Sequence, residues 1–480
     1  MVRTLDYFII ISYLFLIASV GIINSGKGRS AKDYFLGAKS IPWWAVCFSI
    51  VAAETSALTF ISIPGLAYLT NMSFLQVVIG YLIGRIIVAY VFLPAYFKGE
   101  LTTAYAYLEK RFGIKTRYFA SVVFLFTRTA ADGVRLFATA IPIKLLLGIS
   151  YPTAIIIIMA IAILYSIIGG VRSVIWVDVI QMFIYIGGAA VTIFYLLNYL
   201  IPGGFEQFAA TAWNNGKFQI FNPGSFADMH SFFEKPYTFL GGIIGGTFLS
   251  MASHGTDQFI IQRLFTTGDL KASRKAIIGS GVIVLIQFVL FLFVGICLYT
   301  YYGKLDIRAD EIFPKFIIEV LPPGISGLII AGLLAAALST LAGSINSLAS
   351  STVMDIFRVH PDKLKEQKTI NLSRGITLFW SAALIGAAII FMNSSQSVVE
   401  LALGISSFTY GGLLGTFLLG FLVKRANQED ALAAFTAGIF IMITVIALKL
   451  TAWTWYTVIG VSVTVIFGII LSRINKPARQ

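Results

Sequence analysis

Long apolar runs follow one another along almost the whole chain, separated by short polar segments. A helix that crosses a bilayer needs about 20 mostly apolar residues, because the hydrocarbon is about 30 Å thick and a helix rises about 1.5 Å per residue. Thirteen runs meet this requirement, so we expect an all-α, polytopic membrane protein with about 13 transmembrane helices. The runs lie near residues 5–24, 42–69, 73–97, 117–147, 151–170, 174–199, 237–262, 274–302, 324–354, 371–392, 398–423, 429–449 and 453–472.

The composition agrees with a membrane protein. Of the 480 residues, 58% are hydrophobic and only 12% are charged, whereas about a quarter are charged in soluble domains. No polar block is long enough to form a soluble domain, so we expect one transmembrane domain over residues 1–480. The first run carries Asp6 at its start and lacks a basic leader and a cleavage site, which predicts a retained helix.

The net charge of +13 is explained by basic residues in short loops, which fix the orientation of membrane helices, and does not indicate nucleic-acid binding. Most of the 35 Lys and Arg residues lie in alternate loops, on one side of the predicted membrane. By the positive-inside rule, the carboxyl terminus is cytoplasmic and the amino terminus is outside. We therefore expect a multi-pass protein of the plasma (inner) membrane, a monomer whose partners are the lipid bilayer and a small polar solute, with no nucleic acid.

The second apolar run contains polar residues at membrane depth. Glu54, Ser56 and Thr59 lie mid-span, before the helix breaker Pro64. Charges at this depth are expensive and are functional hypotheses by default. The pattern predicts a discontinuous helix that lines a cavity. The alternative is that Glu54 pairs with an arginine for purely structural reasons.

The ninth run has a small, hydroxyl-rich stretch. Ser339 and Thr340 follow Ala336 by one turn, so two hydroxyls and one carbonyl supply hard oxygen donors of the kind that alkali cations accept. Two further carbonyls from a broken helix would complete a five-oxygen site. The alternative is that these small residues serve only close helix packing.

Two further runs carry charged or polar side chains. Arg128, Asp132 and Arg135 share one helix face in the fourth run, which fits either an ion-pair ladder or a site for a polar substrate. The seventh run brings Ser250 and His254 close to its inner end, and we expect His254 to make a structural hydrogen bond.

Six segments together resemble the sodium/solute symporter family, which includes bacterial sialic-acid, galactose and proline symporters and the sodium/glucose transporters. They occur in the family's order along most of the chain: residues 33–37, 60–68, 165–181, 258–263, 327–355 and 411–425. The resemblance implies a leucine-transporter-type fold with two inverted five-helix repeats. Its parts would be a leading helix (5–24), repeat one (about 42–199), an outer loop (201–236), repeat two (about 237–423) and trailing helices (429–472).

The resemblance also implies a sodium site between the first and eighth core helices. Its ligands would be the carbonyls of Ala52, Thr55 and Ala336 and the hydroxyls of Ser339 and Thr340. Relatives that hold a second sodium add serines just beyond this pair and an aspartate in the fifth core helix. Here the aspartate is Asp178, but Ala342 and Gly343 replace the serines. We therefore predict one co-transported sodium ion, with Asp178 in a gating or relay role.

For the substrate, the resemblance implies a site on the broken helix and its neighbours. The resemblance places Glu54, Ser56, Thr59, Phe74 and Ser250 there. The polar residues of the fourth and seventh runs add Asp132, Arg135 and His254 as candidates. The arginine that binds the carboxylate in the sialic-acid transporter aligns with Ala131. A carboxylate at Glu54 suits sugar hydroxyls or an amine, whereas Arg135 or Arg128 suits an acidic group. A sugar or sugar acid is favoured, then an amino acid or a carboxylate.

These observations predict a sodium-coupled symporter that imports a small polar organic solute by alternating access. Coupling would be the reciprocal linkage of two binding free energies. One alternative is proton coupling through Glu54 and Asp178, and a second is a membrane sensor that binds solute without transport. An enzyme is not expected, because no nucleophile with its base and no metal-ligand cluster is visible among three histidines and two cysteines.

Overall fold

The computed structural model describes residues 4–24, 41–55, 57–98, 104–168, 171–224, 229–358, 367–394 and 397–475. Within these ranges the secondary structure is helical throughout, with no strand. The α-helices are α1 (Thr4–Asn24), α3 (Trp43–Glu54), α4 (Ala57–Leu69), α5 (Leu75–Ile87), α6 (Leu93–Lys98), α7 (Ala104–Arg111), α8 (Ile114–Leu147), α9 (Tyr151–Ile168), α10 (Val171–Tyr195), α11 (Gly204–Asn214), α12 (Met229–Glu234), α13 (Phe239–Gly255), α14 (Gln258–Phe265), α15 (Leu270–Tyr302), α16 (Ala309–Glu319), α17 (Ile325–Ser351), α18 (Gln367–Phe391), α19 (Val398–Leu422), α20 (Gln428–Ala447) and α21 (Tyr456–Ile474).

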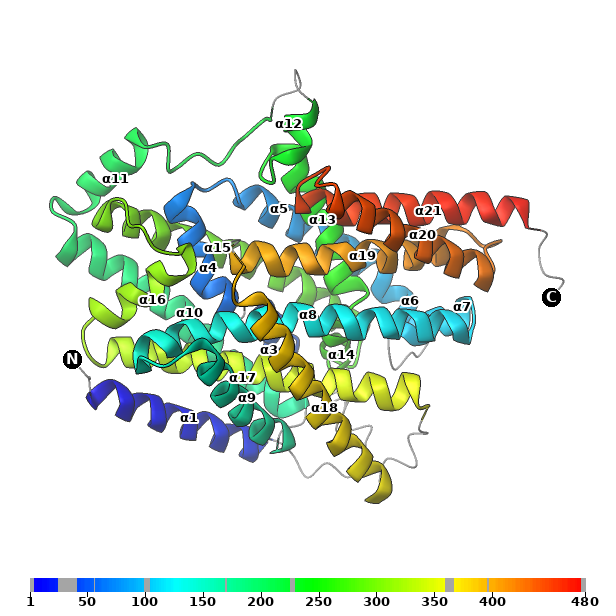
Figure 1. The fold of residues 1–480 in the computed structure, drawn as a ribbon, viewed down its shortest axis with the longest axis horizontal. Coiled ribbons are helices and arrows are strands. Elements are labelled where there is room, and N and C mark those ends of the chain that lie inside the picture. The colour runs from blue at the N-terminus through cyan, green and yellow to red at the C-terminus, as the bar shows by residue number, and fades with distance from the viewer. Residues whose placement is uncertain are drawn as a thin grey trace.

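Several long helices, among them α1, α8, α17, α19 and α21, run roughly parallel to one another, and α18 crosses them obliquely (Figure 1). By length and apolar composition, eight helices among the described residues can each cross a membrane, and ten if each of two bent helix pairs forms one span. The predicted number of thirteen spans stays a prediction. The start of α1 and the end of α21 lie at opposite ends of the molecule (Figure 1).

The second predicted span is a broken helix, as the sequence indicated. Helix α3 ends at Glu54 and α4 begins at Ala57, and the two axes differ by 59°. The expected position of the break was wrong, however, because Pro64 lies inside α4. A proline is tolerated within a buried membrane helix where neighbouring groups satisfy the freed backbone. The polar residues of this span therefore lie at and after the break, not before it.

The seventh predicted span is broken as well. Helix α13 ends at Gly255 and α14 begins at Gln258. Asp257 caps α14, because its side chain accepts a hydrogen bond from the backbone N–H of Phe259 at 2.9 Å. The second and seventh predicted spans are thus both interrupted in the described part of the chain, and helix ends of this kind supply backbone groups without an intrahelical partner.

Glycines allow α5 and α13 to pack backbone against backbone. A Cβ atom at Gly80 would lie 2.5 Å from the carbonyl oxygen of Ile243, and one at Gly246 would lie 2.3 Å from that of Val77. A Cβ atom at Gly84 would lie 2.5 Å from the carbonyl oxygen of Thr247. This spacing of small residues by four is the usual device for close approach of membrane helices. We call Gly80, Gly84, Gly242 and Gly246 the glycine seam.

The leading helix α1 is fastened to the start of α17 by Asp6. One carboxylate oxygen accepts hydrogen bonds from the backbone N–H groups of Gly324, at 2.6 Å, and Gly327, at 3.0 Å. The other accepts from the Ser326 hydroxyl at 2.8 Å. A carboxylate at a helix N-terminus satisfies free N–H groups and complements the helix dipole, so this contact fixes α1 against the helix that carries Ser339.

Candidate functional site

A cavity with about 800 Å³ of empty space lies where the two broken helices meet. The first break contributes Glu54 and Thr59, and the second contributes His254 and Asp257. Helix α8 supplies Arg128 and Arg135. Aromatic side chains form much of the remaining wall: Phe74, Tyr81, Phe259, Phe288 and Tyr410. Apolar walls with a few convergent polar groups are typical of small-molecule sites.

On one wall, Glu54 forms an ion pair with Arg85 of α5. Arg85 is fully buried and also donates to the Ser280 hydroxyl at 2.9 Å. His254 Nε2 lies 3.7 Å from Glu54 Oε2, and its Nδ1 lies 2.8 Å from the Ser253 hydroxyl. Glu54 is thus paired with an arginine, as one of the two interpretations of this residue expected. The carboxylate still reaches the cavity, because 18% of its side chain is exposed.

Where α8 lines the cavity, its charged residues form an ion-pair ladder, one of the two arrangements that the sequence allowed. Asp132 is fully buried and accepts from Arg128 Nε at 2.5 Å and from Arg135 Nη1 at 2.9 Å. Arg128 also lies 3.6 Å from Asp257 and donates to the Ser344 hydroxyl at 2.9 Å. The two arginines of the ladder also line the cavity, so the two interpretations of this helix face are compatible.

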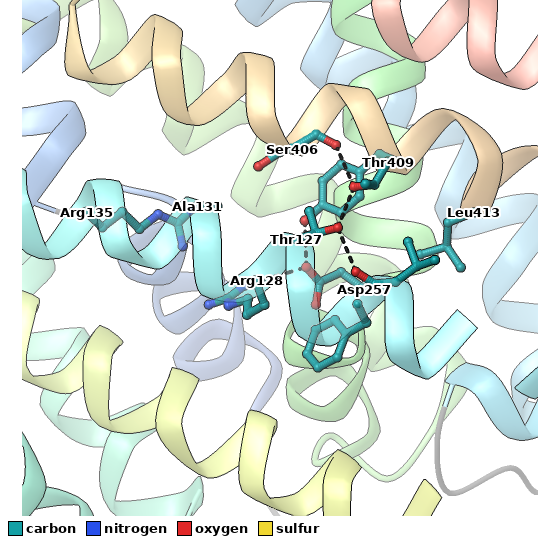
Figure 2. A pocket seen from close by; sticks show the side chains of 11 residues that line it. Thr127, Arg128, Ala131, Arg135, Asp257, Ser406, Thr409 and Leu413 are labelled. Carbon is teal, nitrogen blue, oxygen red and sulfur yellow. Dashed lines mark hydrogen bonds and ion pairs between the residues drawn. The ribbon is translucent and has the colours of Figure 1, made fainter. Parts of the chain in front are cut away.

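A second pocket, with about 360 Å³ of empty space, adjoins the cavity. Figure 2 shows it between α8 and α19. The two spaces share five lining residues: Arg128, Arg135, Asp257, Ser406 and Tyr410. The pocket extends from them toward Val123 and Leu413. Thr127 and Thr409 join the two helices beside it through a hydroxyl hydrogen bond of 2.6 Å.

Asp178 of α10 connects the helices that carry the predicted sodium ligands. Its carboxylate accepts from Ser49 of α3 at 2.6 Å and from Ser339 of α17 at 3.0 Å. Arg263 of α14 lies 3.4 Å from the same carboxylate and also donates to the Ser49 hydroxyl at 3.0 Å. Asp178 of α10 thus contacts side chains of three other helices, α3, α14 and α17.

The predicted sodium ligands are buried and offer the right donor type. Thr55 and Ser339 are fully buried, and Thr340 is 5% exposed. The Thr55 hydroxyl donates to the side-chain oxygen of Gln287 at 2.9 Å. Because α3 stops at Glu54, carbonyls in its last turn lack the helical partner that a continued helix would provide. The described residues contain no group of three or more His, Cys, Asp or Glu side chains that could hold a metal ion.

The structure gathers five of the predicted substrate residues at the cavity: Glu54, Thr59, Phe74, Arg135 and His254. Asp132 lies behind the wall, where it supports both arginines. Ser250 is not among the lining residues, because its hydroxyl turns toward α5 and donates to the carbonyl of Tyr81 at 2.9 Å. Ser56 lies outside the described residues.

Sequence reasoning missed several residues of the site. Arg85 was visible as a charge within an apolar run, and that signal could have marked it as a residue of the site. Asp257 and Arg263 lie near the second break, where their charges resemble an ordinary helix end. Tyr410 and Gln287 carry no signal, because a single tyrosine or glutamine in a span does not reveal its contacts.

Comparisons with known proteins agree with this arrangement. The model of the sodium:solute symporter family matches residues 34–438. The sodium/sialic acid symporter NanT of Aliivibrio fischeri is 30% identical, over 98% of this chain and 94% of its own. A solved Na+-coupled sialic acid symporter, in a substrate-bound outward-open state, superposes with a TM-score of 0.85 at 28% identity over the whole of both chains.

A similar fold occurs in a solved structure of much lower sequence identity. Mhp1, a transporter of the nucleobase-cation-symport-1 family, gives a TM-score of 0.60 at 12% identity over 92% of this chain and 93% of its own. The predicted leucine-transporter-type fold is therefore confirmed. The chain belongs to the sodium:solute symporter family and is a sodium-coupled membrane transporter, not an enzyme.

Proposed function

We propose that this symporter imports a small polar organic solute, a sugar or sugar acid, together with one sodium ion. The observation that carries the proposal is the cavity at the two helix breaks, which is lined by Glu54 and His254 together with Arg128 and Arg135. Carboxylate and imidazole groups bind hydroxyls, and guanidinium groups bind an acid. The two sodium-coupled symporters described above are sialic acid symporters, and sialic acid is a sugar acid, which supports the same class of substrate here.

The sodium site that we propose comprises the carbonyls of Ala52, Thr55 and Ala336 and the hydroxyls of Ser339 and Thr340. Two features support it. The carboxyl end of α3 presents the negative end of the helix dipole, which attracts a cation. The Ser339 hydroxyl donates a hydrogen bond to Asp178, so the lone pairs of its oxygen can bind a cation.

Asp178 would then act as a relay between ion and protein. It contacts Ser339 directly and reaches α3 and α14 through Ser49 and Arg263. An ion at Ser339 would therefore change the electrostatic environment of residues on both broken helices. Since sodium and solute would each stabilise the same arrangement of these helices, each would raise the affinity for the other.

The route of the solute would run through both spaces. The cavity and the second pocket share the wall formed by Arg128, Arg135 and Tyr410. Solute would enter the cavity from outside and leave along α8 and α19 through the second pocket. With the excess of basic loops placed inside, this direction agrees with a cytoplasmic carboxyl terminus and an outside amino terminus. We propose a monomer in the plasma (inner) membrane, with one transport domain over residues 1–480 and no nucleic-acid partner.

The test is the sodium dependence of solute binding. The purified protein is heated with sialic acid, galactose or propionate, in sodium and in potassium, because a bound ligand raises apparent stability. We expect stabilisation that requires sodium. Ser339→Ala should raise the half-saturating sodium concentration at least tenfold. Ser347→Ala is the matched control, because the Ser347 hydroxyl bonds only to the nearby Ser344 carbonyl in the same helix.

Equal stabilisation in sodium and potassium would contradict the proposal, as would a Ser339→Ala variant with unchanged sodium dependence. The alternative of a sensor that binds without transport is set aside, because the chain belongs to a family of symporters. The proton-coupled alternative is set aside, because the family is sodium-coupled.

A further inference from the structure

The aromatic ring of Phe259 contacts two arginines that belong to different parts of the site. Phe259 lies near the start of α14, is 4% exposed and lines the cavity. The guanidinium carbon of Arg128 lies 4.2 Å from the centre of the ring, and that of Arg263 lies 3.9 Å from the same centre. Arg128 lines the cavity, whereas Arg263 lies 3.4 Å from Asp178, the hydrogen-bond partner of Ser339. One ring therefore joins the cavity wall to the surroundings of the proposed sodium site.

The same ring also packs against the helix that carries Ser339. A Cβ atom at Gly343 would lie 2.9 Å from Cε2 of Phe259, so the ring lies directly against this glycine. Ser339 and Gly343 are four residues apart in α17 and therefore lie on one face of the helix. A movement of this part of α17 would consequently displace the ring.

The backbone of Phe259 is fixed by two hydrogen bonds. Its N–H donates to the Asp257 carboxylate at 2.9 Å, and its carbonyl accepts from Arg263 Nη1 at 3.0 Å. Phe259 is the second residue of α14, so these bonds hold it directly after the break in the seventh predicted span. The ring thus has a defined position relative to both arginines and to α17.

A cation over an aromatic ring is attracted by the quadrupole of the ring, and the attraction is stronger where water is excluded. Arginine stays protonated in proteins, so both guanidinium contacts involve a cation. A side chain that is already held in place loses less conformational freedom when a ligand binds, which improves affinity. The position of the Phe259 ring therefore affects how well Arg128 is placed for a solute in the cavity.

We infer that Phe259 is a positioning residue that couples sodium binding to solute binding. The inference rests on the proposed function, since it assumes a sodium ion at Ser339 and a solute in the cavity. Sodium would fix this part of α17, Gly343 would then fix the ring, and the ring would hold Arg128 in the cavity wall. Solute would strengthen sodium binding through the same contacts, because coupling between two binding sites is reciprocal.

The test is the coupling factor, which is the ratio of the half-saturating sodium concentrations without and with a saturating probe. Thermal stabilisation of purified protein measures both concentrations, with sialic acid, galactose or propionate as the probe. Phenylalanine analogues with one, two or three ring fluorines at position 259 keep the shape of the ring but weaken its attraction for a cation. We expect the coupling factor to fall stepwise along this series, by about fivefold in total. Size-exclusion profiles check that each variant is folded.

Two glycine variants test the contact between the ring and α17. Gly343→Ala adds a methyl group that pushes against the Phe259 ring, so it should lower the coupling factor about threefold. Gly187→Ala in α10 is the matched control, because nothing lies within 4 Å of its added Cβ. Its coupling factor should equal that of the wild type. Equal coupling factors for Gly343→Ala and Gly187→Ala would contradict the contact with α17 as part of the coupling.

A coupling factor that stays constant along the fluorinated series would overturn the inference and leave the proposed function intact. The same holds if Phe259→Leu lowers the factor but fluorination does not, because the volume of the side chain would then be what matters. Wild-type protein whose probe binding is independent of sodium, or that binds no probe, would contradict the proposed function and the inference together. A chain of contacts carries coupling only if a change in one link changes the coupling free energy, and the fluorinated series measures that change directly.

Discussion

Arg85 shows how a single residue in this site depends on its partner. It is fully buried, and its ion pair with Glu54 lies at the first helix break. Removing one member of a buried pair leaves the other charge without compensation, which costs about 3 kcal/mol or more. Arg85→Gln should therefore lower the free energy of unfolding by about this amount, whereas Arg85→Gln combined with Glu54→Gln should recover most of it. Thermal unfolding in detergent measures both, and additive effects would show that the pair is not coupled.

Lys217 offers a prediction about pH at the residue scale. It lies in the segment between α11 and α12, where its amine donates to the carbonyls of Tyr68 and Thr70 at 2.6 and 2.9 Å and lies 4.0 Å from the ring centre of Tyr299. Burial lowers the pKa of Lys217 to about 8. The unfolded chain keeps the ordinary pKa near 10.4, so between about pH 8 and 10 the unfolded state binds more protons.

The stability of wild-type protein should therefore gain a contribution from Lys217 as pH rises through this window. Lys217→Met removes the titrating group and should remove that contribution. The measurement is the difference between the thermal midpoints of the two proteins at pH 7 and pH 9.5. A difference that does not change with pH would contradict the lowered pKa.

The residues of the site were only partly predictable. Glu54, Arg135 and His254 were found because a polar group at membrane depth is expensive and therefore conspicuous. Their contacts were not predictable, since Glu54 and Arg85 come from different helices and only the fold brings them together. Ser250 was misplaced for the same reason: its hydroxyl faces the Tyr81 carbonyl, and a helix face cannot be assigned from a span that is apolar all round.

At the scale of elements, the glycine seam determines how closely α5 and α13 approach. A Cβ atom at Gly246 would meet the Val77 carbonyl oxygen at 2.3 Å, so the helices would have to separate. Gly246→Ala should lower the free energy of unfolding by about 2 kcal/mol, as expected for overpacking. Gly386→Ala in α18 is the control, because nothing lies within 4 Å of its added Cβ. Equal thermal midpoints for the two variants would contradict the close packing.

The sequence predicted the long helices well and their interruptions less well. Apolar length is a strong signal, and every predicted run corresponds to one described helix or to consecutive helices. The first break was expected near Pro64 but lies at Thr55, because a break depends on which backbone groups neighbours can satisfy. The short helices α7, α11, α12 and α16 were not predicted, since they lie in polar connections without a long apolar run.

For the whole molecule, orientation in the membrane is the prediction to check. Lys304 and Arg425 are exposed, and the positive-inside rule places the first outside and the second inside. Lys304→Cys should react with an impermeant maleimide on intact cells, whereas Arg425→Cys should react only after permeabilisation. The native Cys47 and Cys297 are 2% and 0% exposed, so they should add little background to the maleimide labelling. Labelling of Arg425→Cys on intact cells would reverse the orientation.

The hydrogen bonds between Asp6 and the start of α17 also have a consequence for biosynthesis. Its partners Gly324, Ser326 and Gly327 lie more than 300 residues downstream, so α1 enters the bilayer long before the ribosome has produced its docking site. Helix α1 therefore lies in the membrane without its contact to α17 while both interrupted helices are synthesised. Contacts between such distant segments form late and slowly. During biogenesis, attachment of α1 is thus a closing step, after which the helix that carries Ser339 is covered.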